Sequence, residues 1–356
     1  RNELDTPPTV YETTKAIKQL SKGKAAGPDG IPAEVYQCAG PPLAQSLTHL
    51  FEAIWQQCKV PQDFKDALIV HLYKNKGNRH NCDNHRGISL LSIAGKVLSK
   101  VIINRLTSTI ADDVIPESQC GFRSSRSTTD MLFAARQVQE KCREQNCDLF
   151  MVFVDLTKAF DSVSREGLWK VLAKAGCPPT IVKVIRSFHD GMVGRVFDDG
   201  CLSDPFEVTN GTKQGCVMAP LLFSLVFAAV LEDAFAECEI GVKIRFRSDG
   251  SIFNLRRLKA KTKTSTMVLR ELLYADDCAL IAHSLEDAQC LVDAFSRATT
   301  RFGLSISIAK TEVLHQPKPG SLPNTETISV DDEPLKSVDK FCYLGGTISQ
   351  NARIDD

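Results

Sequence analysis

Three aspartates stand where apolar segments of the chain end or turn. Asp155 directly follows a continuous apolar run from Leu149 to Val154, and Asp276 and Asp277 are adjacent to each other between two apolar flanks. An ionised carboxylate at the end of a buried strand is costly unless it has a partner, and a cation is a suitable one. An Asp-Asp pair alone is a common turn. The prediction therefore depends on both acid sites meeting in one sheet, across 276 − 155 = 121 residues.

Carboxylate oxygens suit Mg²⁺, which keeps several waters and binds through one or two carboxylates plus substrate phosphates. Two such ions about 3.5–4 Å apart can activate an attacking hydroxyl and stabilise the leaving oxygen of an in-line displacement. We therefore expect Asp155, Asp276 and Asp277 to be catalytic residues and ligands of two Mg²⁺ ions, for which Mn²⁺ can substitute. Phosphoryl transfer is the chemistry that this set predicts.

The elements around these acids predict an α+β fold, an antiparallel sheet backed by helices. In chain order the pattern predicts a strand over 149–154, helices near 165–175 and 180–189, a hairpin over 193–208 that turns at Asp199-Gly200, a buried helix over 221–237, strands over 267–274 and 278–282, a helix from Ser284 to Phe302 and a strand over 304–308.

The part of the chain before residue 149 is predicted to be mostly helical. Its expected features are a turn at Gly27-Pro28-Asp29-Gly30 between two short helical segments, an amphipathic helix over 43–57, a strand over 67–73, a long helix with apolar positions from Leu91 to Ile102, and a capping box of Ser127 and Asp130 that opens the next helix.

Charge is balanced overall but not locally. Lys plus Arg and Asp plus Glu both number 43, and 43% of the residues are hydrophobic, as in a folded protein. Eight basic residues against one acid lie between Gly241 and Lys263, and eight against two acids lie between Lys65 and Arg105. One such run is usually a solvated face, whereas two runs flanking a carboxylate site favour contact with phosphate backbones.

The thirteen cysteines show no pairing pattern of a zinc site and predict buried thiols in a reducing, intracellular compartment. The apolar stretch Ala219 to Leu231 is shorter than the roughly 20 residues of a membrane span, and no secretion signal is recognisable. Because the chain begins at Arg1, we expect it to be a piece of a longer polypeptide.

Two motifs around the aspartates match a known family. The segment from Phe153 to Asp161 resembles the first catalytic motif of reverse transcriptases, and Tyr274 to Asp277 resembles their Tyr-x-Asp-Asp signature. Further segments are similar to other motifs of the family in the same order: Lys24 to Pro32, His85 to Leu91, Gln119 to Ser127, Asn210 to Cys216 with Ala219 to Phe223, Gly303 to Thr311, and Phe341 to Gly345. An ordered series of this kind is far more specific than any one motif.

The resemblance is to the non-LTR (LINE-type) retrotransposon branch and covers about residues 24 to 348. It implies a right-hand polymerase fold, with an RNA template, a DNA primer and deoxynucleoside triphosphates (dNTPs) as partners, no membrane, and the nucleus as the place of action. It also implies endonuclease and thumb domains on the full-length polypeptide. The implied domains are 1–42 as an N-terminal extension and start of the fingers, 43–148 as fingers, 149–348 as palm with a fingers-like or basic insertion near 178–265, and 349–356 as a truncated link to the thumb.

The resemblance also assigns roles to single residues. Phe160 would exclude a ribose 2′-hydroxyl, and Gln214 and Gly215 would pack against the nascent base pair. Lys74 and Arg86 would neutralise the triphosphate, although Lys76 and Arg79 compete with Lys74 for this role. Lys310 would stand near the pyrophosphate leaving group as a proton donor or charge stabiliser. The turn of Tyr343, Leu344 and Gly345 would hold the primer, and a purely structural hairpin explains that segment equally well.

Three other functions remain as alternatives. A nucleotide cyclase of the palm type uses paired metals on a similar sheet, but lacks the segment around Gln214 and these fingers motifs. A decayed copy of an element would bind nucleic acid without polymerising. A group II intron-type reverse transcriptase shares the reaction class and much of the fingers resemblance.

Overall fold

The chain forms two units, and each is built from two separate stretches of sequence. Unit 1 contains residues 1–116 and 160–227, and unit 2 contains residues 117–159 and 228–356. The computed structural model describes residues 4–212, 215–247, 264–322 and 326–352. The expected domain boundary after residue 42 lies within unit 1 and that after residue 148 within unit 2, so the division into fingers and palm stays a prediction.

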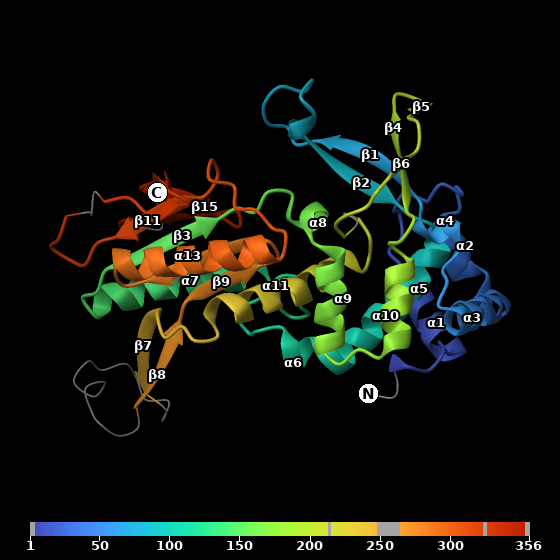
Figure 1. The fold of residues 1–356 in the computed structure, drawn as a ribbon, viewed down its shortest axis with the longest axis horizontal. Helices are drawn as coiled ribbons and strands as arrows, with labels where there is room; N and C mark the ends of the chain where they lie inside the picture. Colours follow the sequence, from blue (N-terminus) through green and yellow to red (C-terminus); the bar gives the residue numbers. More distant parts are fainter. Residues whose placement is uncertain (1–3, 213–214, 248–263, 323–325, 353–356) are drawn as a thin grey trace. The chain divides into compact units, whose positions relative to one another are not determined.

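Unit 1 is mainly helical (Figure 1). Its helices are α1 (Val10–Lys18), α2 (Ala33–Cys38), α3 (Gly40–Gln57), α4 (Gln62–Lys65), α5 (Ile93–Leu106), α6 (Asp112–Val114), α9 (Arg165–Lys174) and α10 (Pro179–Ser187), while α8 (Ala159–Ser162) and α11 (Ala219–Phe235) cross the division between the units. A buried arginine ties three of them together. Arg105 of α5 donates to both carboxylate oxygens of Glu12 in α1, at 2.6 and 2.8 Å, and its guanidinium lies over the Trp55 ring of α3.

Unit 1 also holds a sheet of five short strands. These are β1 (Ala67–Tyr73), β2 (His85–Leu90), β4 (Val193–Asp198), β5 (Cys201–Leu202) and β6 (Phe206–Glu207). β1 pairs antiparallel with β2 and parallel with β4. The turn between β4 and β5 has positive φ at Asp199 (48°) and Gly200 (83°), as a type I′ hairpin requires, which confirms the predicted hairpin.

The sheet of unit 2 has β3 at its centre. Its strands are β3 (Leu149–Val154), β9 (Glu271–Tyr274), β10 (Asp277–Ala282), β11 (Glu312–Gln316) and β14 (Lys336–Ser337), in the order β14-β11-β3-β10-β9. Both neighbours of β3 run antiparallel to it. All six residues of β3 are buried, as the continuous apolar run predicts for a strand covered on both faces.

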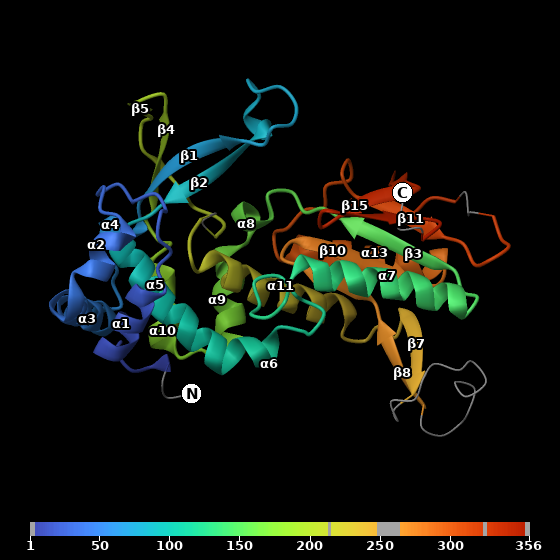
Figure 2. The same cartoon turned by 180° about the vertical axis from the view of Figure 1, so that it is seen from behind.

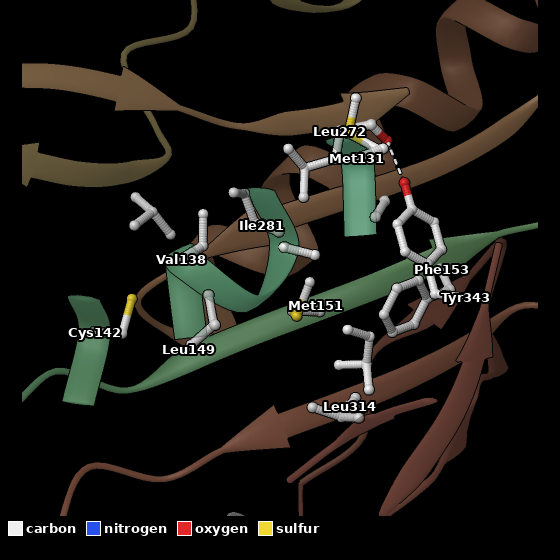
Figure 3. Packing of buried hydrophobic residues seen from close by; sticks show 14 of the residues in the cluster. Met131, Val138, Cys142, Leu149, Met151, Phe153, Leu272, Ile281, Leu314 and Tyr343 are labelled. Carbon is white, nitrogen blue, oxygen red and sulfur yellow. Dashed lines mark hydrogen bonds between the residues drawn. The ribbon is translucent and has the colours of Figure 1, made fainter. Parts of the chain in front are cut away.

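Two helices cover the two faces of this sheet. The α7 helix (Thr128–Glu144) lies on one side and α13 (Leu285–Arg301) on the other, as Figures 1 and 2 show from opposite directions. Side chains alternate between the faces of a strand, and Leu149, Met151 and Phe153 of β3 belong to the cluster on the α7 side (Figure 3). This α+β arrangement agrees with the predicted sheet backed by helices. The sheet is antiparallel as predicted except at one edge, where β14 runs parallel to β11.

Caps fix the start of both covering helices. The predicted capping box of α7 is present, because the Ser127 hydroxyl accepts from the Asp130 N–H while the Asp130 carboxylate accepts from the Ser127 N–H. In α13 the Ser284 side chain accepts from the Asp287 N–H, and Gly303 follows the helix with a φ of 78°. Both helix starts were predicted from sequence.

Three small hairpins complete unit 2. They pair β7 (Val242–Arg247) with β8 (Thr264–Leu269), β12 (Ser329–Val330) with β13 (Glu333–Pro334), and β15 (Lys340–Tyr343) with β16 (Gly346–Ser349). Residues 248–263, which hold most of the basic run predicted to contact phosphates, lie outside the described residues.

Two predicted strands were wrong. The predicted strand over 267–274 is two strands, because the chain changes partner at Arg270: β8 pairs with β7, whereas β9 pairs with β10. The predicted strand over 304–308 is reduced to a single bridge between Leu156 and Ile306. After that bridge the chain turns, since Lys310 N–H donates to Ser307 O, and the strand that enters the sheet, β11, begins at Glu312.

All thirteen cysteines are free thiols, as predicted, but they are not all buried: Cys38, Cys82, Cys201, Cys290 and Cys342 are exposed. In the parts of the chain that the structure describes, the helices are too short or too polar to cross a membrane.

The central position of β3 can be tested with two methionines of unit 2. Met151 in β3 is 0% exposed, and Met267 in β8 is 56% exposed. Because Met151→Ala leaves a cavity, we expect it to lower the free energy of unfolding by about 2–5 kcal/mol. The exposed Met267→Ala should change it by less than about 0.5 kcal/mol. Urea denaturation followed by circular dichroism measures both, and equal losses would contradict a buried β3.

Candidate active site

The register between β3 and β10 brings two of the predicted aspartates to the same edge of the sheet. Cys278 of β10 lies opposite Val154 of β3. The strands are antiparallel, so Asp277, one residue before Cys278, and Asp155, one residue after Val154, are neighbours across the strands. The two acid sites, far apart in sequence, therefore meet in unit 2 as the apolar runs predicted.

A tight turn carries the second acid site. Tyr274, the last residue of β9, pairs with Asp277, the first residue of β10, so Ala275 and Asp276 form a two-residue turn. Ala275 is buried and has a φ of 59°, a left-handed conformation that is uncommon for residues other than glycine. Asp276 is thereby presented at the tip, next to Asp277.

Lys310 lies beside the first aspartate. Its ammonium Nζ is 3.3 Å from Oδ1 of Asp155, and its side chain is 68% exposed. The turn that carries Lys310 is bonded to the segment that follows β3, because Ser307 N–H donates to Asp155 O and Thr157 N–H donates to Ser305 O, both at 2.8 Å. The predicted catalytic lysine is therefore near the predicted metal ligands.

Thr311 is a site residue for which the sequence predicted no role. It is fully buried, and its hydroxyl oxygen accepts a hydrogen bond from the Asp155 N–H at 3.3 Å. Its place directly after Lys310, at the end of a motif that resembles a catalytic one, is the sequence signal that could have identified it.

A small pocket of about 60 Å³ opens between these groups. Its walls are formed by Phe153, Val154, Asp155, Asp277, Cys278, Lys310, Phe341 and Tyr343. It combines two carboxylates and one ammonium group with apolar walls. Such a site can hold a cation and a polar reactant while limiting access of water.

The carboxylates in this pocket repel each other. Partial burial, followed by the negative charges of Asp276 and Asp155, raises the pKa of Asp277 from its ordinary value of 3.8 to about 6. Although Asp277 is exposed as a residue at the start of β10, two other carboxylates lie close enough to disfavour its ionised form. In the folded chain the ionised form of this carboxyl group is therefore less favourable than in the unfolded chain.

The donor chemistry at this edge fits a divalent cation such as Mg²⁺. Asp155, Asp276 and Asp277 offer only hard oxygen donors, and a cation would relieve the repulsion that raises the pKa of Asp277. In the described ranges no group of three His, Cys, Asp or Glu side chains is arranged to hold a metal ion. The carboxylates are thus gathered without forming a complete coordination shell.

The predicted primer turn is the tip of the β15–β16 hairpin. Leu344 and Gly345 have positive φ, at 49° and 84°. The Tyr343 side chain points into the core, where its hydroxyl donates to Leu272 O at 3.4 Å (Figure 3), and burial raises the pKa of Tyr343 well above its usual range. Of the three residues in the predicted primer turn, Tyr343 is therefore buried in the core, while Leu344 and Gly345 form the tip.

Phe341 is a second site residue for which the sequence predicted no individual role. It lines the pocket, and its ring is stacked on that of Phe153, with centroids 4.0 Å apart and planes at 7°. This contact packs the β15–β16 hairpin against β3 at Phe153, two residues before Asp155. Its place within the motif from Phe341 to Gly345 was the available signal.

The predicted triphosphate ligands lie in unit 1, at one end of the β1–β2 hairpin. Lys74 follows β1, and its ammonium donates to the main-chain oxygen of Asp83 at 2.8 Å. Arg86 lies in β2 opposite Leu72 and is exposed. The structure thus gives Lys74 a bond within its loop, while the Arg86 side chain faces solvent.

The residues predicted to contact the base and sugar also lie in unit 1. The Phe160 ring packs on Phe223 of α11, with centroids 4.6 Å apart. Gly215 has a φ of 96°, and a Cβ atom there would lie 2.9 Å from Ser89 O of β2, so only glycine allows this close approach. Gln214 lies outside the described residues.

Comparison with known protein families adds an independent finding. The family model described as "Reverse transcriptase (RNA-dependent DNA polymerase)" matches residues 73–348. The match contains both acid sites, Lys310 and the hairpin of Tyr343.

Several curated relatives resemble the chain. The "RNA-directed DNA polymerase from mobile element jockey" of Drosophila melanogaster is 25% identical over 353 residues, covering 96% of this chain and 35% of the relative. Its namesake from Drosophila funebris is 30% identical over 228 residues, covering 62% and 24%. The "Transposon TX1 uncharacterized 149 kDa protein" of Xenopus laevis is 26% identical over 289 residues, covering 81% and 20%. The chain spans about a third or less of the length of these relatives.

The raised pKa of Asp277 predicts how stability depends on pH. Because the folded chain disfavours the ionised carboxylate, the free energy of unfolding should fall as pH rises from 3.8 to about 6. Asp277→Asn removes the charge, so in metal-free buffer it should raise the melting temperature above pH 6 and change it little below pH 3.8.

The control for this prediction is Asp331→Asn. It makes the same chemical change at an exposed turn of unit 2 where Asp331 has a φ of 48°, a conformation that asparagine tolerates. Thermal melts of both variants across pH 3.5 to 8 test the idea. A pH-independent effect of Asp277→Asn would contradict the proposed charge repulsion.

Proposed function

Because the family match covers most of its length, this protein belongs to the reverse transcriptase (RNA-dependent DNA polymerase) family, and we propose that it is the polymerase core of a non-LTR (LINE-type) retrotransposon. The proposed reaction adds dNTPs to the 3′-hydroxyl of a DNA primer along an RNA template. The names of the relatives from the jockey elements, which describe RNA-directed DNA polymerases, support this choice.

The observation that carries the proposal is the register of β3 and β10, which places Asp155 and Asp277 side by side with Asp276 on the adjoining turn. Nucleotide addition requires a cluster of carboxylates at one point of a rigid scaffold. A central strand buried on both faces provides such a scaffold. Side chains of like charge that a fold holds close together are typical of functional sites.

We assign the three aspartates as ligands of two Mg²⁺ ions. When bound, these ions would make the primer hydroxyl more acidic and stabilise negative charge on the transferred phosphoryl group. All three would hold the ions, Asp155 and Asp277 from the sheet edge and Asp276 from the adjoining turn. Lys310, an exposed cation 3.3 Å from Asp155, would stabilise charge on the leaving pyrophosphate or donate a proton to it.

We propose that residues of unit 1 contact the incoming nucleotide. Phe160 would exclude the 2′-hydroxyl of ribonucleotides, and its ring packs on that of Phe223. Gly215 and Gln214 would pack against the nascent base pair, and Arg86 and Lys74 would neutralise the triphosphate. The Lys74 ammonium would have to exchange its bond with the Asp83 carbonyl for a phosphate oxygen, whereas Arg86 is already exposed.

The right-hand assembly of fingers and palm belongs to this proposal, with the sheet of unit 2 as palm. We also propose that Leu344 and Gly345 contact the primer. The full-length polypeptide would carry thumb and endonuclease domains and would act in the nucleus. The greater length of the relatives is consistent with additional domains.

Extension of a DNA primer on an RNA template, with Mg²⁺ and dNTPs, tests the activity. Asp276→Asn should lower the rate by about 1,000-fold, because it removes several kcal/mol of transition-state stabilisation. It should leave the affinity for a primer–template duplex unchanged. Asp331→Asn, the same change at the exposed turn of unit 2, is the matched control.

The outcomes distinguish the proposed polymerase from a decayed copy. Extension by the wild type that is lost in Asp276→Asn supports the polymerase and its metal site. Duplex binding without extension by a folded wild-type chain, across Mg²⁺ and Mn²⁺ concentrations, would instead favour a nucleic-acid-binding remnant.

The role of Phe160 is tested by substituting a small side chain. Phe160→Ala opens space beside the sugar, so we expect discrimination between dNTPs and ribonucleotides to fall about 10- to 200-fold, the range by which an apolar pocket distinguishes one small group. Phe197→Ala, at an exposed phenylalanine of β4, is the control. The ratio of kcat/KM for dCTP and CTP measures the effect, and an unchanged ratio would rule out the sugar contact.

A further inference from the structure

A buried glutamine is bonded to the turn that carries Asp276 and Asp277. Gln119 is 1% exposed. Its side-chain amide Nε2 donates to Ala275 O at 3.0 Å, and its Oε1 accepts from Ala275 N–H at 2.9 Å. One side chain therefore satisfies both main-chain groups of the residue that directly precedes Asp276.

The main chain on both sides of Gln119 runs alongside β9. Cys120 N–H donates to Leu273 O at 2.9 Å, and Leu273 N–H donates to Ser118 O at 3.1 Å. These bonds form a short parallel bridge between Gln119 and Leu273. The backbone of Gln119 is thus bonded to Leu273, two residues before Ala275, while its side chain binds Ala275 itself.

The spacing of the Gln-Cys-Gly segment matches this geometry. Gly121 N–H donates to the same Oε1 atom of Gln119, at 2.8 Å, so this oxygen accepts two bonds and its orientation is fixed. A Cβ atom at Gly121 would collide with the main-chain nitrogen of Ala275. Glycine is therefore required two residues after the glutamine so that the backbone can lie directly against the turn.

Ala275 depends on such a partner. Its φ of 59° places it in a conformation that alanine adopts rarely, and it is buried, so water cannot supply the missing bonds. A buried main-chain N–H and C=O without partners would favour rearrangement of the turn. Any rearrangement there would move Asp276 and Asp277.

We propose that Gln119 is a positioning residue of the active site, which fixes the carboxylates of Asp276 and Asp277 for metal binding by holding the backbone of Ala275. The inference rests on the proposed metal-dependent function. Gln119 does not itself contact the metal or the substrate. It sets the geometry of the turn, in the way that residues behind metal ligands commonly orient them.

Unit 2 offers a matched control for a purely structural role. Gln139 of α7 is also buried, at 2% exposed, and its Nε2 donates to Gln316 Oε1 at 3.0 Å and to Ser349 O at 2.9 Å. Gln316 pairs with Leu149, the first residue of β3. Gln139 therefore lies at the end of the sheet opposite to Asp155, and its loss should affect stability without affecting the metal ligands.

The experiment compares Gln119→Met and Gln139→Met in the full chain. We expect Gln119→Met to weaken Mn²⁺ binding, followed by electron paramagnetic resonance, by about 10- to 100-fold, as for other residues that orient metal ligands. Hydrogen exchange should become faster in the peptide containing Ala275. Both properties should be unchanged in Gln139→Met, although both variants should melt at a lower temperature than the wild type.

Equal Mn²⁺ affinities in the two variants would overturn the positioning role, whether or not exchange at Ala275 increases. If Gln119→Met does not fold, Gln119→Asn, which keeps the amide but shortens its reach by one methylene, decides by the same two measurements. Mn²⁺ binding requires no polymerisation. A wild type that binds Mn²⁺ but does not extend primers would therefore contradict the proposed function and still test the role of Gln119.

Discussion

The pairing of β3 with β10 is the constraint on which the candidate active site depends. Cys278 opposite Val154 sets Asp277 beside Asp155. Since side chains alternate along a strand, a slip of one residue would move Asp277 to the other face of the sheet. The same slip would exchange the residues that face α7 and α13, so the close packing of particular side chains on each face fixes the register. The apolar core and the carboxylate geometry are therefore one structural requirement.

That register also creates an electrostatic conflict. It brings carboxylates together where water is partly excluded, and the raised pKa of Asp277 is the result. Lys310 offsets part of the charge at Asp155, but at 68% exposure it is well solvated, and an ion pair of this kind contributes little. The folded chain thus carries a local instability that a bound cation would relieve. Destabilised groups of this kind are common where function and stability make opposite demands.

Sequence patterns predicted the parts of the fold that local chemistry determines. The apolar run of β3, the hairpin at Asp199-Gly200 and the caps of α7 and α13 each depend on residues close together in the chain. The break at Arg270 could not be predicted in this way, because an apolar run does not reveal that its two halves pair with different strands. Likewise the short bridge at Ile306 depends on hydrogen bonds to the segment after Asp155, which is remote in sequence.

In the site, too, the sequence pattern predicted some features, whereas others depend on bonding partners that are remote in sequence. Residue types and order identified the aspartates and Lys310, but not the buried polar groups that bond to the backbone beside them. Thr311 accepts from the Asp155 N–H, and Gln119 binds both main-chain groups of Ala275. Apolar packing selects the layer and the register, yet it is non-directional and leaves the orientation of a turn loosely defined. Directional bonds from buried side chains supply that orientation, which is why a carboxylate site requires them in addition to a well-packed sheet.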